Sequence, residues 1–467
     1  MKKGIEMHPV GQTRIEERAG ASSWPWASPV RQRELRVRRG RLLAALLSLA
    51  LPAPGPVMAD DDAAVTRYAG GWVFDGERFQ VRDLCVRANE LVACPSTPDA
   101  EIRVDGAYIT PPFGDAHTHH FDGPGTLAWH TSMAFESGAF YAMNMTAATS
   151  QVRLIRDRMG GPGNVDAISS TGGITGPESH PAEIYEALAL GAYSFEDQLQ
   201  RADEIRASRK VADDAYYVIE SEEQLAKKWP LILAGKPDFI KVFLRSSERY
   251  DEGFGKWGPG GGIDPRLLPQ IRDRASSAGL RLAVANSSIG DFRASLEAKA
   301  DIVTHLPCYQ DSSQDPDSPY YDTDTADECL ISLAEAERAS AQGLSAVLIV
   351  TEWAKERPAE QVLWERQNLD RLRAAGVRLA IGSNAYGSTL TEGLIAGMDK
   401  GFLPPADLLR IATMDTPSLI FPERRVGCLD VDCEASFIAF AGNPLEDSRQ
   451  LGNIILRVKD GSETIVD

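Results

Sequence analysis

Short apolar segments alternate with helix-type segments through most of this 467-residue chain, and this alternation most constrains its fold. Eight apolar segments have the length of strands: a first that ends at His119, then 138–146, 165–175, 237–244, 281–287, 300–307, 345–353 and 378–384. The later segments are separated by helical patterns at 265–280, 290–300, 332–343 and 359–376. Eight strands that alternate with helices predict an α/β fold, a (β/α)8 TIM barrel.

Both flanks of this region have a β pattern instead. Residues 67–106 and 426–467 contain short strand patterns separated by turns, and Asp75-Gly76 is typical of a hairpin. We therefore expect the N- and C-terminal segments to form one small composite β-sandwich domain. The predicted division is a signal peptide and leader at 1–59, the two parts of the β-sandwich domain at 60–106 and 423–467, and the barrel at 107–422.

The first 59 residues have the pattern of a secretory signal peptide. Arginines between Arg36 and Arg41 precede the apolar run 42–51, and a Pro-rich stretch then ends with Val57 and Ala59, small residues where a signal peptidase cleaves. We predict an exported protein, periplasmic or secreted after removal of this segment. No internal apolar run has the length of a membrane span, so we expect no stable membrane insertion.

The charge of the chain argues against nucleic acid as a partner. The net charge is −18, and the first 59 residues hold ten Lys or Arg and four Asp or Glu, so their removal would leave −24. Such an acidic surface repels nucleic acids and anionic membranes. We expect a small-molecule substrate, and the composition does not indicate an oligomeric state.

Six cysteines follow the leader in three close pairs: Cys85 and Cys94, Cys308 and Cys329, Cys428 and Cys433. In an exported protein, an even number of cysteines in close pairs indicates disulfides. We predict local pairing, with cross-pairing among the four cysteines outside the central region as the alternative. Cys308 and Cys329 bound an acidic loop, which is interpreted as a solvated loop or as a lid.

Histidines gather where the first strand ends. His117 and His119 are one residue apart, so on a strand both side chains point the same way and can bind one zinc. Lys241 interrupts a later apolar strand, and a buried lysine needs a partner or a function. His305 lies at the end of another strand. Because active sites of such barrels lie at the C-terminal ends of the strands, these residues are candidate metal ligands.

With these segments the chain resembles the amidohydrolase superfamily over nearly all of residues 67–467. The matching stretches are GDAHTHH at 114–120, DFIKVFL at 238–244, ADIVTHLP at 300–307 and AIGSN at 380–384. TPPFGDAH and TGGITGPESHP further resemble an exported bacterial subgroup. The resemblance implies a metal-dependent hydrolase that cleaves C–N bonds, amide or peptide-like, with metal-activated water.

The resemblance also implies a role for each candidate residue. His117 and His119 would bind one metal ion, and a carboxylated Lys241 would bridge it to a second. His305 and a histidine on strand five would hold the second ion. An aspartate on strand eight would move the proton as general base and acid.

The sequence departs from this pattern at two strands. Strand five offers Ala285 and Asn286 instead of a histidine, and Asn384 replaces the aspartate on strand eight. An asparagine cannot take up a proton at neutral pH. We therefore expect zinc or another divalent ion, one per chain, or none. The alternative is a catalytically inactive protein kept for ligand or partner binding, with a carboxylate beside Lys241.

Other polar residues near these segments have plainer interpretations. We expect His120 and His130 to be structural or exposed, Asp115 to be structural, and His180 to lie in a solvated loop near the mouth of the site.

Overall fold

The computed structural model describes residues 63–252, 261–309 and 326–464. The chain separates into two units, Met1–Val57 and Met58–Asp467, and every described residue belongs to the second. The predicted signal peptide and residues 310–325 of the acidic loop lie outside the described residues. Within the described ranges, no helix is long and apolar enough to cross a membrane.

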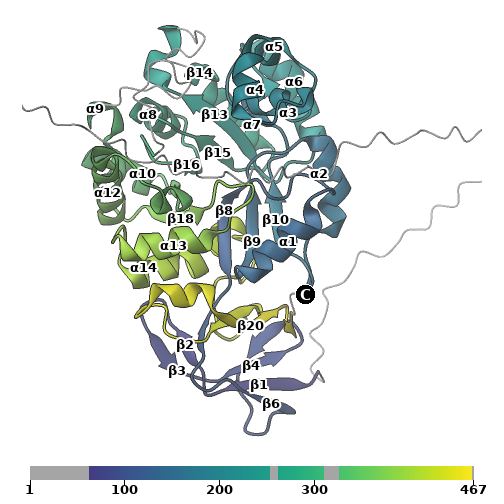
Figure 1. The fold of residues 1–467 in the computed structure, drawn as a ribbon, viewed down its shortest axis with the longest axis vertical. Helices are drawn as coiled ribbons and strands as arrows, with labels where there is room; N and C mark the ends of the chain where they lie inside the picture. Colours follow the sequence, from purple (N-terminus) through teal and green to yellow (C-terminus); the bar gives the residue numbers. More distant parts are fainter. Residues whose placement is uncertain (1–62, 253–260, 310–325, 465–467) are drawn as a thin grey trace, which may run out of the picture. The chain divides into compact units, whose positions relative to one another are not determined.

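Parallel strands form the centre of the molecule (Figure 1). One sheet has the order β10-β9-β8, and a second has the order β12-β11-β13-β15-β16-β17-β18. Every residue of β8, β9 and β17 is buried, which is typical of parallel strands covered on both faces. The strands are β8 (Phe113–Thr118), β9 (Ala139–Asn144), β10 (Asp166–Ser169), β11 (Gly173–Thr175), β12 (Tyr216–Val218), β13 (Ile240–Arg245), β15 (Leu282–Ala285), β16 (Ile302–Thr304), β17 (Ser345–Ile349) and β18 (Arg378–Gly382).

Backbone hydrogen bonds join both outer strands of the first sheet, β8 and β10, to the second sheet. The amide of Asn384, after β18, donates to the carbonyl of His117 in β8 (2.6 Å). The amide of Asp238, before β13, donates to the carbonyl of Ser169 in β10 (2.9 Å). The arrangement is a mixed α/β fold consistent with a (β/α)8 barrel.

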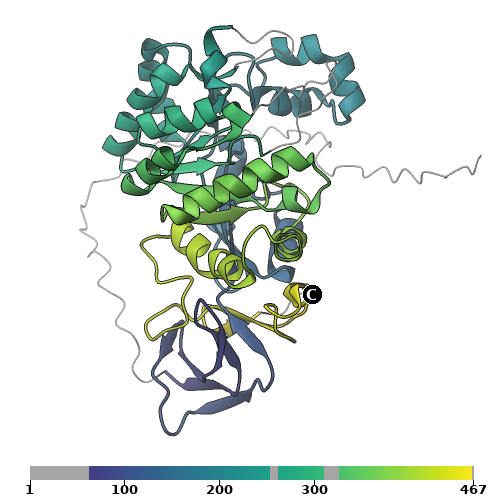
Figure 2. The same ribbon diagram turned by 90° about the vertical axis from the view of Figure 1, so that its left-hand side faces the viewer.

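Helices lie outside the parallel strands in both views (Figures 1 and 2). Ser288 and Ser332 begin two of them, and each forms a capping box with an acidic residue three positions later, Asp291 or Glu335. The helices are α1 (Leu127–Glu136), α2 (Thr149–Ile155), α3 (Ala182–Leu190), α4 (Phe195–Gln200), α5 (Ala202–Ala207), α6 (Glu222–Ala234), α7 (Leu268–Ser277), α8 (Ile289–Glu297), α9 (Ala326–Cys329), α10 (Leu333–Ala341), α11 (Thr351–Ala354), α12 (Ala359–Ala374), α13 (Leu390–Asp399), α14 (Pro405–Arg410) and α15 (Thr416–Ile420).

Both ends of the described chain build a pair of sheets beside the parallel strands. One sheet has the order β5-β4-β1-β6, and the other has the order β21-β20-β19-β7-β2-β3. β19 pairs antiparallel with β7, and both sheets contribute to one apolar cluster that includes Tyr68, Ile109 and Phe437. The strands are β1 (Val65–Ala69), β2 (Trp72–Phe74), β3 (Phe79–Val81), β4 (Leu84–Arg87), β5 (Glu90–Val92), β6 (Ala100–Arg103), β7 (Tyr108–Thr110), β19 (Phe437–Phe440), β20 (Ile454–Lys459) and β21 (Ser462–Glu463).

Two of the predicted strands are each divided into two strands in the structure. The apolar stretch that ends at His119 is two strands in different sheets, because β7 pairs with β2 and β19 whereas β8 pairs with β9. The stretch 165–175 is broken into β10 and β11, and Thr171 between them has a positive φ of 59°. The prediction of three local disulfides is confirmed: Cys85–Cys94, Cys308–Cys329 and Cys428–Cys433.

Candidate metal centre

His117 and His119 lie at the C-terminal end of β8, where β18 runs alongside. Their ring centroids are 5.4 Å apart. The amide of His119 donates to the carbonyl of Ala385 (3.3 Å), and Asn384 bonds to His117 through the backbone as described above. The strand neighbour therefore fixes the backbone of both histidines.

Lys241 is buried within β13, with 1% of its surface exposed. Its Nζ donates to Thr304 Oγ1 (2.5 Å) and lies 5.3 Å from the centre of the Phe243 ring. Burial lowers the pKa of Lys241 well below its ordinary value, and no carboxylate among the described residues opposes this effect. The acidic partner expected for an inactive protein is therefore not seen beside Lys241 in the described ranges.

His305 follows β16 directly, on a backbone with a positive φ of 73°. Its ring stacks on the ring of Tyr309, with centroids 4.0 Å apart and an interplanar angle of 7°. The ring of His117 also lies next to the ring of His305, and the centroids of these two rings are 4.8 Å apart. The structure thus brings β8 and β16 histidines together, as the strand-end argument predicts.

Burial keeps the imidazoles of this site neutral. Desolvation lowers the pKa of His117 and His305 well below the ordinary value. Desolvation likewise lowers the pKa of His119 to about 4. Nδ1 of His117 and Nε2 of His305 are buried without a hydrogen-bond partner. A neutral imidazole with a free nitrogen is the state that binds a metal ion.

These donors fit a metal ion only if Lys241 takes part. No three His, Cys, Asp or Glu side chains of the described residues are arranged to hold a metal ion together. A third ligand beside two histidines would have to come from Lys241, which must first gain an oxygen donor. The neutral amine that burial favours is the form that reacts with carbon dioxide to give a carbamate.

Ala285 and Asn384, the two departures from the family pattern, also lie at the C-terminal ends of parallel strands. Ala285 ends β15, and in the sheet register it pairs with Phe243 on one side and Thr304 on the other. Asn384 follows β18 with a positive φ of 48°, and its side chain hydrogen-bonds the ring of His119. Asn384 therefore contacts the candidate ligands, but it cannot accept a proton from water.

His180 lies closer to the site than its loop position suggested. Its ring is 5.1 Å from the Phe243 ring, and its Nδ1 is 2.9 Å from Oε1 of Glu183. His180 is among the groups that contribute to the low pKa of His117, His119 and His305, so it lies near these three residues. Its side chain is 43% exposed, in keeping with a position near the mouth. Strand periodicity gives no signal for such a residue, because its loop follows no fixed repeat.

Asp115 links the first and last parallel strands. It accepts hydrogen bonds from the amide of His117 (3.1 Å) and from the amide and hydroxyl of Ser383 (3.0 and 2.6 Å). Burial raises the pKa of Asp115 to about 6. These contacts support the structural role expected from the sequence.

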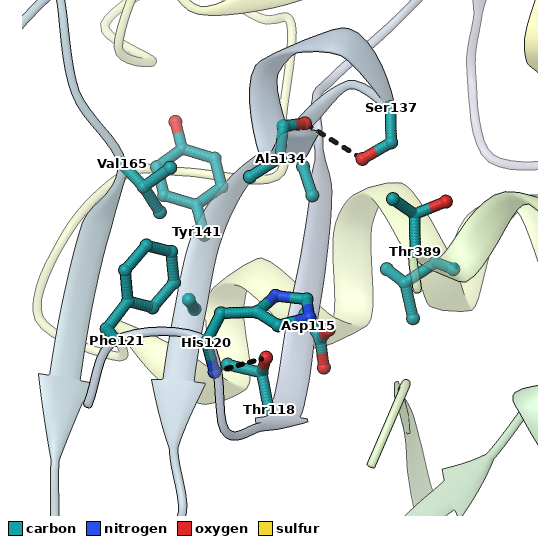
Figure 3. Close-up of a pocket in the computed structure, with 12 residues that line it drawn as sticks. Asp115, Thr118, His120, Phe121, Ala134, Ser137, Tyr141, Val165 and Thr389 are labelled. Carbon is teal, nitrogen blue, oxygen red and sulfur yellow. Dashed lines mark hydrogen bonds between the residues drawn. The ribbon is translucent and has the colours of Figure 1, made fainter. Parts of the chain in front are cut away.

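His120 and His130 form a separate pair beside the site. Their rings stack with centroids 4.9 Å apart, and Nε2 of His130 lies 2.9 Å from the carbonyl of Tyr386. The cavity drawn in Figure 3 is lined by His120 and Thr118, joined by the hydrogen bond from the amide of His120 (3.3 Å). None of the four candidate metal ligands lines this cavity, so it is distinct from the candidate metal centre.

The fold is shared with solved structures of hydrolases at low sequence identity. Ochratoxinase from A. niger matches with a TM-score of 0.62 and 17% identity, over 86% of this chain and 96% of that chain. A Xaa-Pro dipeptidase with bound methionine matches with a TM-score of 0.62 and 15% identity, over 86% and 100%. A protein described as an amidohydrolase matches with a TM-score of 0.60 and 13% identity, over 86% and 99%.

The chain therefore shares its fold with these hydrolases, one of which is described as an amidohydrolase, in agreement with the fold that the resemblance predicts. No protein-family model and no curated protein sequence matches the chain.

Proposed function

We propose that the chain is a metal-dependent hydrolase that cleaves C–N bonds, amide or peptide-like, in small molecules. One zinc or another divalent ion would be held by His117, His119 and a carboxylated Lys241. The observation that carries the proposal is the pair His117 and His305, each a buried, neutral imidazole with one nitrogen that has no hydrogen-bond partner. They lie near a lysine that has no carboxylate partner among the described residues. The similarity to a Xaa-Pro dipeptidase supports the class of bond.

The proposal also covers the domain architecture of the chain and the cellular compartment in which the protein works. The parallel strands would close into a (β/α)8 barrel at 107–422, with a β-sandwich domain from 60–106 and 423–467. Three disulfides support an oxidising compartment, so we propose export, to the periplasm or beyond, after removal of the segment 1–59. The acidic charge supports a small-molecule substrate rather than nucleic acid.

The residues of the chain would divide the chemistry among them. The metal, when bound, supplies an acidified water and polarises the scissile carbonyl. The neutral amine of Lys241 would add to carbon dioxide and release one proton, which leaves a carbamate with two oxygen donors. His305 would border the position of a second metal, which keeps too few ligands for tight binding because Ala285 offers none.

A second candidate is an inactive protein of the same fold that binds a ligand or partner. It is favoured by Asn384, whose amide occupies the position of the general base and hydrogen-bonds His119.

Metal content separates the two candidates. Elemental analysis of the purified protein should give about one divalent ion per chain, and His117→Ala and Lys241→Met should each lose it. His130→Gln is the matched control, because His130 lies outside the site, and it should retain the ion. No metal in the wild-type protein after incubation with zinc would contradict the hydrolase.

Restoring the missing groups tests catalysis. The double variant Ala285→His, Asn384→Asp should be assayed beside the wild type on panels of amides, dipeptides and esters. Activity in both proteins supports the hydrolase. Activity that appears only in the restored protein would show that the natural chain is inactive.

A further inference from the structure

The ring of His305 is oriented by its neighbours rather than by its own strand. β16 ends at Thr304, and His305 continues on a left-handed backbone outside the regular strand. Tyr309 stacks flat on one face of the ring, and Asn286 hydrogen-bonds the ring through its backbone. The fixed ring of His305 lies 4.8 Å from the ring of the proposed ligand His117, centroid to centroid, and so limits the directions that this ligand can take.

Tyr309 is in turn anchored from outside the site. Its carbonyl accepts a hydrogen bond from Nη1 of Arg357 (2.8 Å). The guanidinium of Arg357 forms an ion pair with Glu365, whose other oxygen accepts from Nε1 of Trp353 (2.9 Å). The side chains of Arg357 and Glu365 are 1% and 3% exposed, so water does not screen this pair.

A disulfide closes the same segment. Cys308 directly precedes Tyr309, has a positive φ of 58°, and donates its amide to the carbonyl of Ser287 (2.9 Å). It is bonded to Cys329, 21 residues later, whose carbonyl accepts from the side chain of Asn368 (2.8 Å). Cys308 is thus tied to the loop after β15 and, through Cys329, to α12.

We propose that Tyr309 is a positioning residue for His305, whose ring packs against the proposed ligand His117. The Cys308–Cys329 disulfide helps to hold Tyr309 there, so that the orientation of His117, and with it metal binding, depends on this bond. The inference rests on the proposed metal-dependent function. Cleavage of the disulfide removes one of the anchors of the backbone that carries Tyr309. The Tyr309 ring then holds the His305 ring less firmly, and His117 loses part of the surface against which its own ring packs. The other two disulfides lie among the strands of the terminal segments and carry no such link.

Zinc affinity, measured by competition with a chromophoric chelator, tests the proposal without an activity assay. Cys308→Ser/Cys329→Ser and Tyr309→Ala should each weaken zinc binding about tenfold or more, the effect of losing a group that orients a ligand. Tyr309→Phe keeps the stacked ring and should restore the affinity. Cys85→Ser/Cys94→Ser is the matched control and should bind zinc as the wild type does.

Two results would overturn the proposal, and they are distinguishable. If the wild type binds zinc and both Tyr309→Ala and Cys308→Ser/Cys329→Ser bind it equally well, the positioning role is wrong while the metal site stands. If the wild type binds no zinc, the proposed function fails and this inference with it. If the double cysteine variant does not fold, by its thermal transition, the comparison of Tyr309→Ala with Tyr309→Phe decides.

Discussion

Burial gives the candidate ligands a sensitivity to acid. In the folded protein the pKa of His119 is lowered to about 4, whereas a histidine in an unfolded chain titrates near 6.5. Protons therefore bind the unfolded chain more readily, and the stability that neutral His119 contributes is complete above pH ~6.5 and is lost as the pH falls toward 4. His117 and His305 are shifted in the same direction.

We predict that the melting temperature falls between pH 7 and pH 5, and that His119→Gln flattens this decline. The shift of His119 corresponds to at most about 3 kcal/mol. Asp115 acts in the opposite sense, because its raised pKa of about 6 makes its contribution greatest at low pH and smaller as the pH rises. A melting temperature that rises on acidification to pH 5 would show that Asp115 outweighs the histidines.

The sequence predicts some of these residues and not others, for a physical reason. His117, His119, Lys241 and His305 lie on or directly after strands, where alternation and strand ends determine which side chains meet. His180 and Tyr309 reach the site from loops, and only the folded chain determines which loop residues meet.

Contact between the first and last parallel strands depends on one glycine of β18. A Cβ added at Gly382 would lie 2.4 Å from the Cβ of His117 and 2.7 Å from its backbone nitrogen. Any side chain there would push β8 away from β18 and would disturb the backbone that carries the histidine pair.

We predict that Gly382→Ala lowers the free energy of unfolding by about 1–3 kcal/mol, the usual effect of overpacking, and weakens zinc binding. Urea denaturation and zinc titration check both effects. Gly163→Ala is the control, because a Cβ at Gly163 meets nothing within 4 Å. Equal stability of the two variants would mean that the strands adjust without strain.

A continuous apolar stretch predicts a strand correctly where the whole stretch stays extended. It predicts the end of the strand wrongly where the backbone turns into a helix within the stretch. The apolar stretches 281–287 and 378–384 contain β15 and β18. The stretch 345–353 is apolar to its end, but the strand β17 stops at Ile349 and the helix α11 begins at Thr351. Hydrophobicity alone does not distinguish a buried strand from the buried start of a helix.

A buried cluster of charges connects the C-terminal strands to the parallel sheet. Lys459 on β20 is fully buried and donates to Asp166 on β10 (2.8 Å) and to the carbonyl of Gly161 (2.6 Å). Arg424 donates to the same Asp166 (2.7 Å) and pairs with Glu434 (2.6 Å). Asp166 thus pairs with both Lys459 and Arg424, two cations that lie far from it in the sequence.

We predict that Lys459→Met lowers the free energy of unfolding by about 3 kcal/mol, because the buried carboxylate of Asp166 then loses one of its positive partners. Arg103→Ala removes an exposed pair with Asp105 and should leave the free energy of unfolding nearly unchanged, because water screens this pair. Chemical denaturation of both variants measures the difference. Similar values would mean that Arg424 alone compensates Asp166.

At the scale of the molecule, the composite β region follows from the β patterns at both ends of the sequence. The charge cluster does not, because Lys459 and Asp166 are far apart in the chain and neither lies in a motif.

The pairing of β7 with β19 also sets an order of events during synthesis. β7 leaves the ribosome early, yet its antiparallel partner is among the last strands to be made. Until then the N-terminal strands present an unpaired edge, which is a template for association with other chains. Truncated products that lack the C-terminal strands would keep this edge open, so aggregation and proteolysis, rather than accumulation of a stable fragment, are the expected fate of incomplete chains.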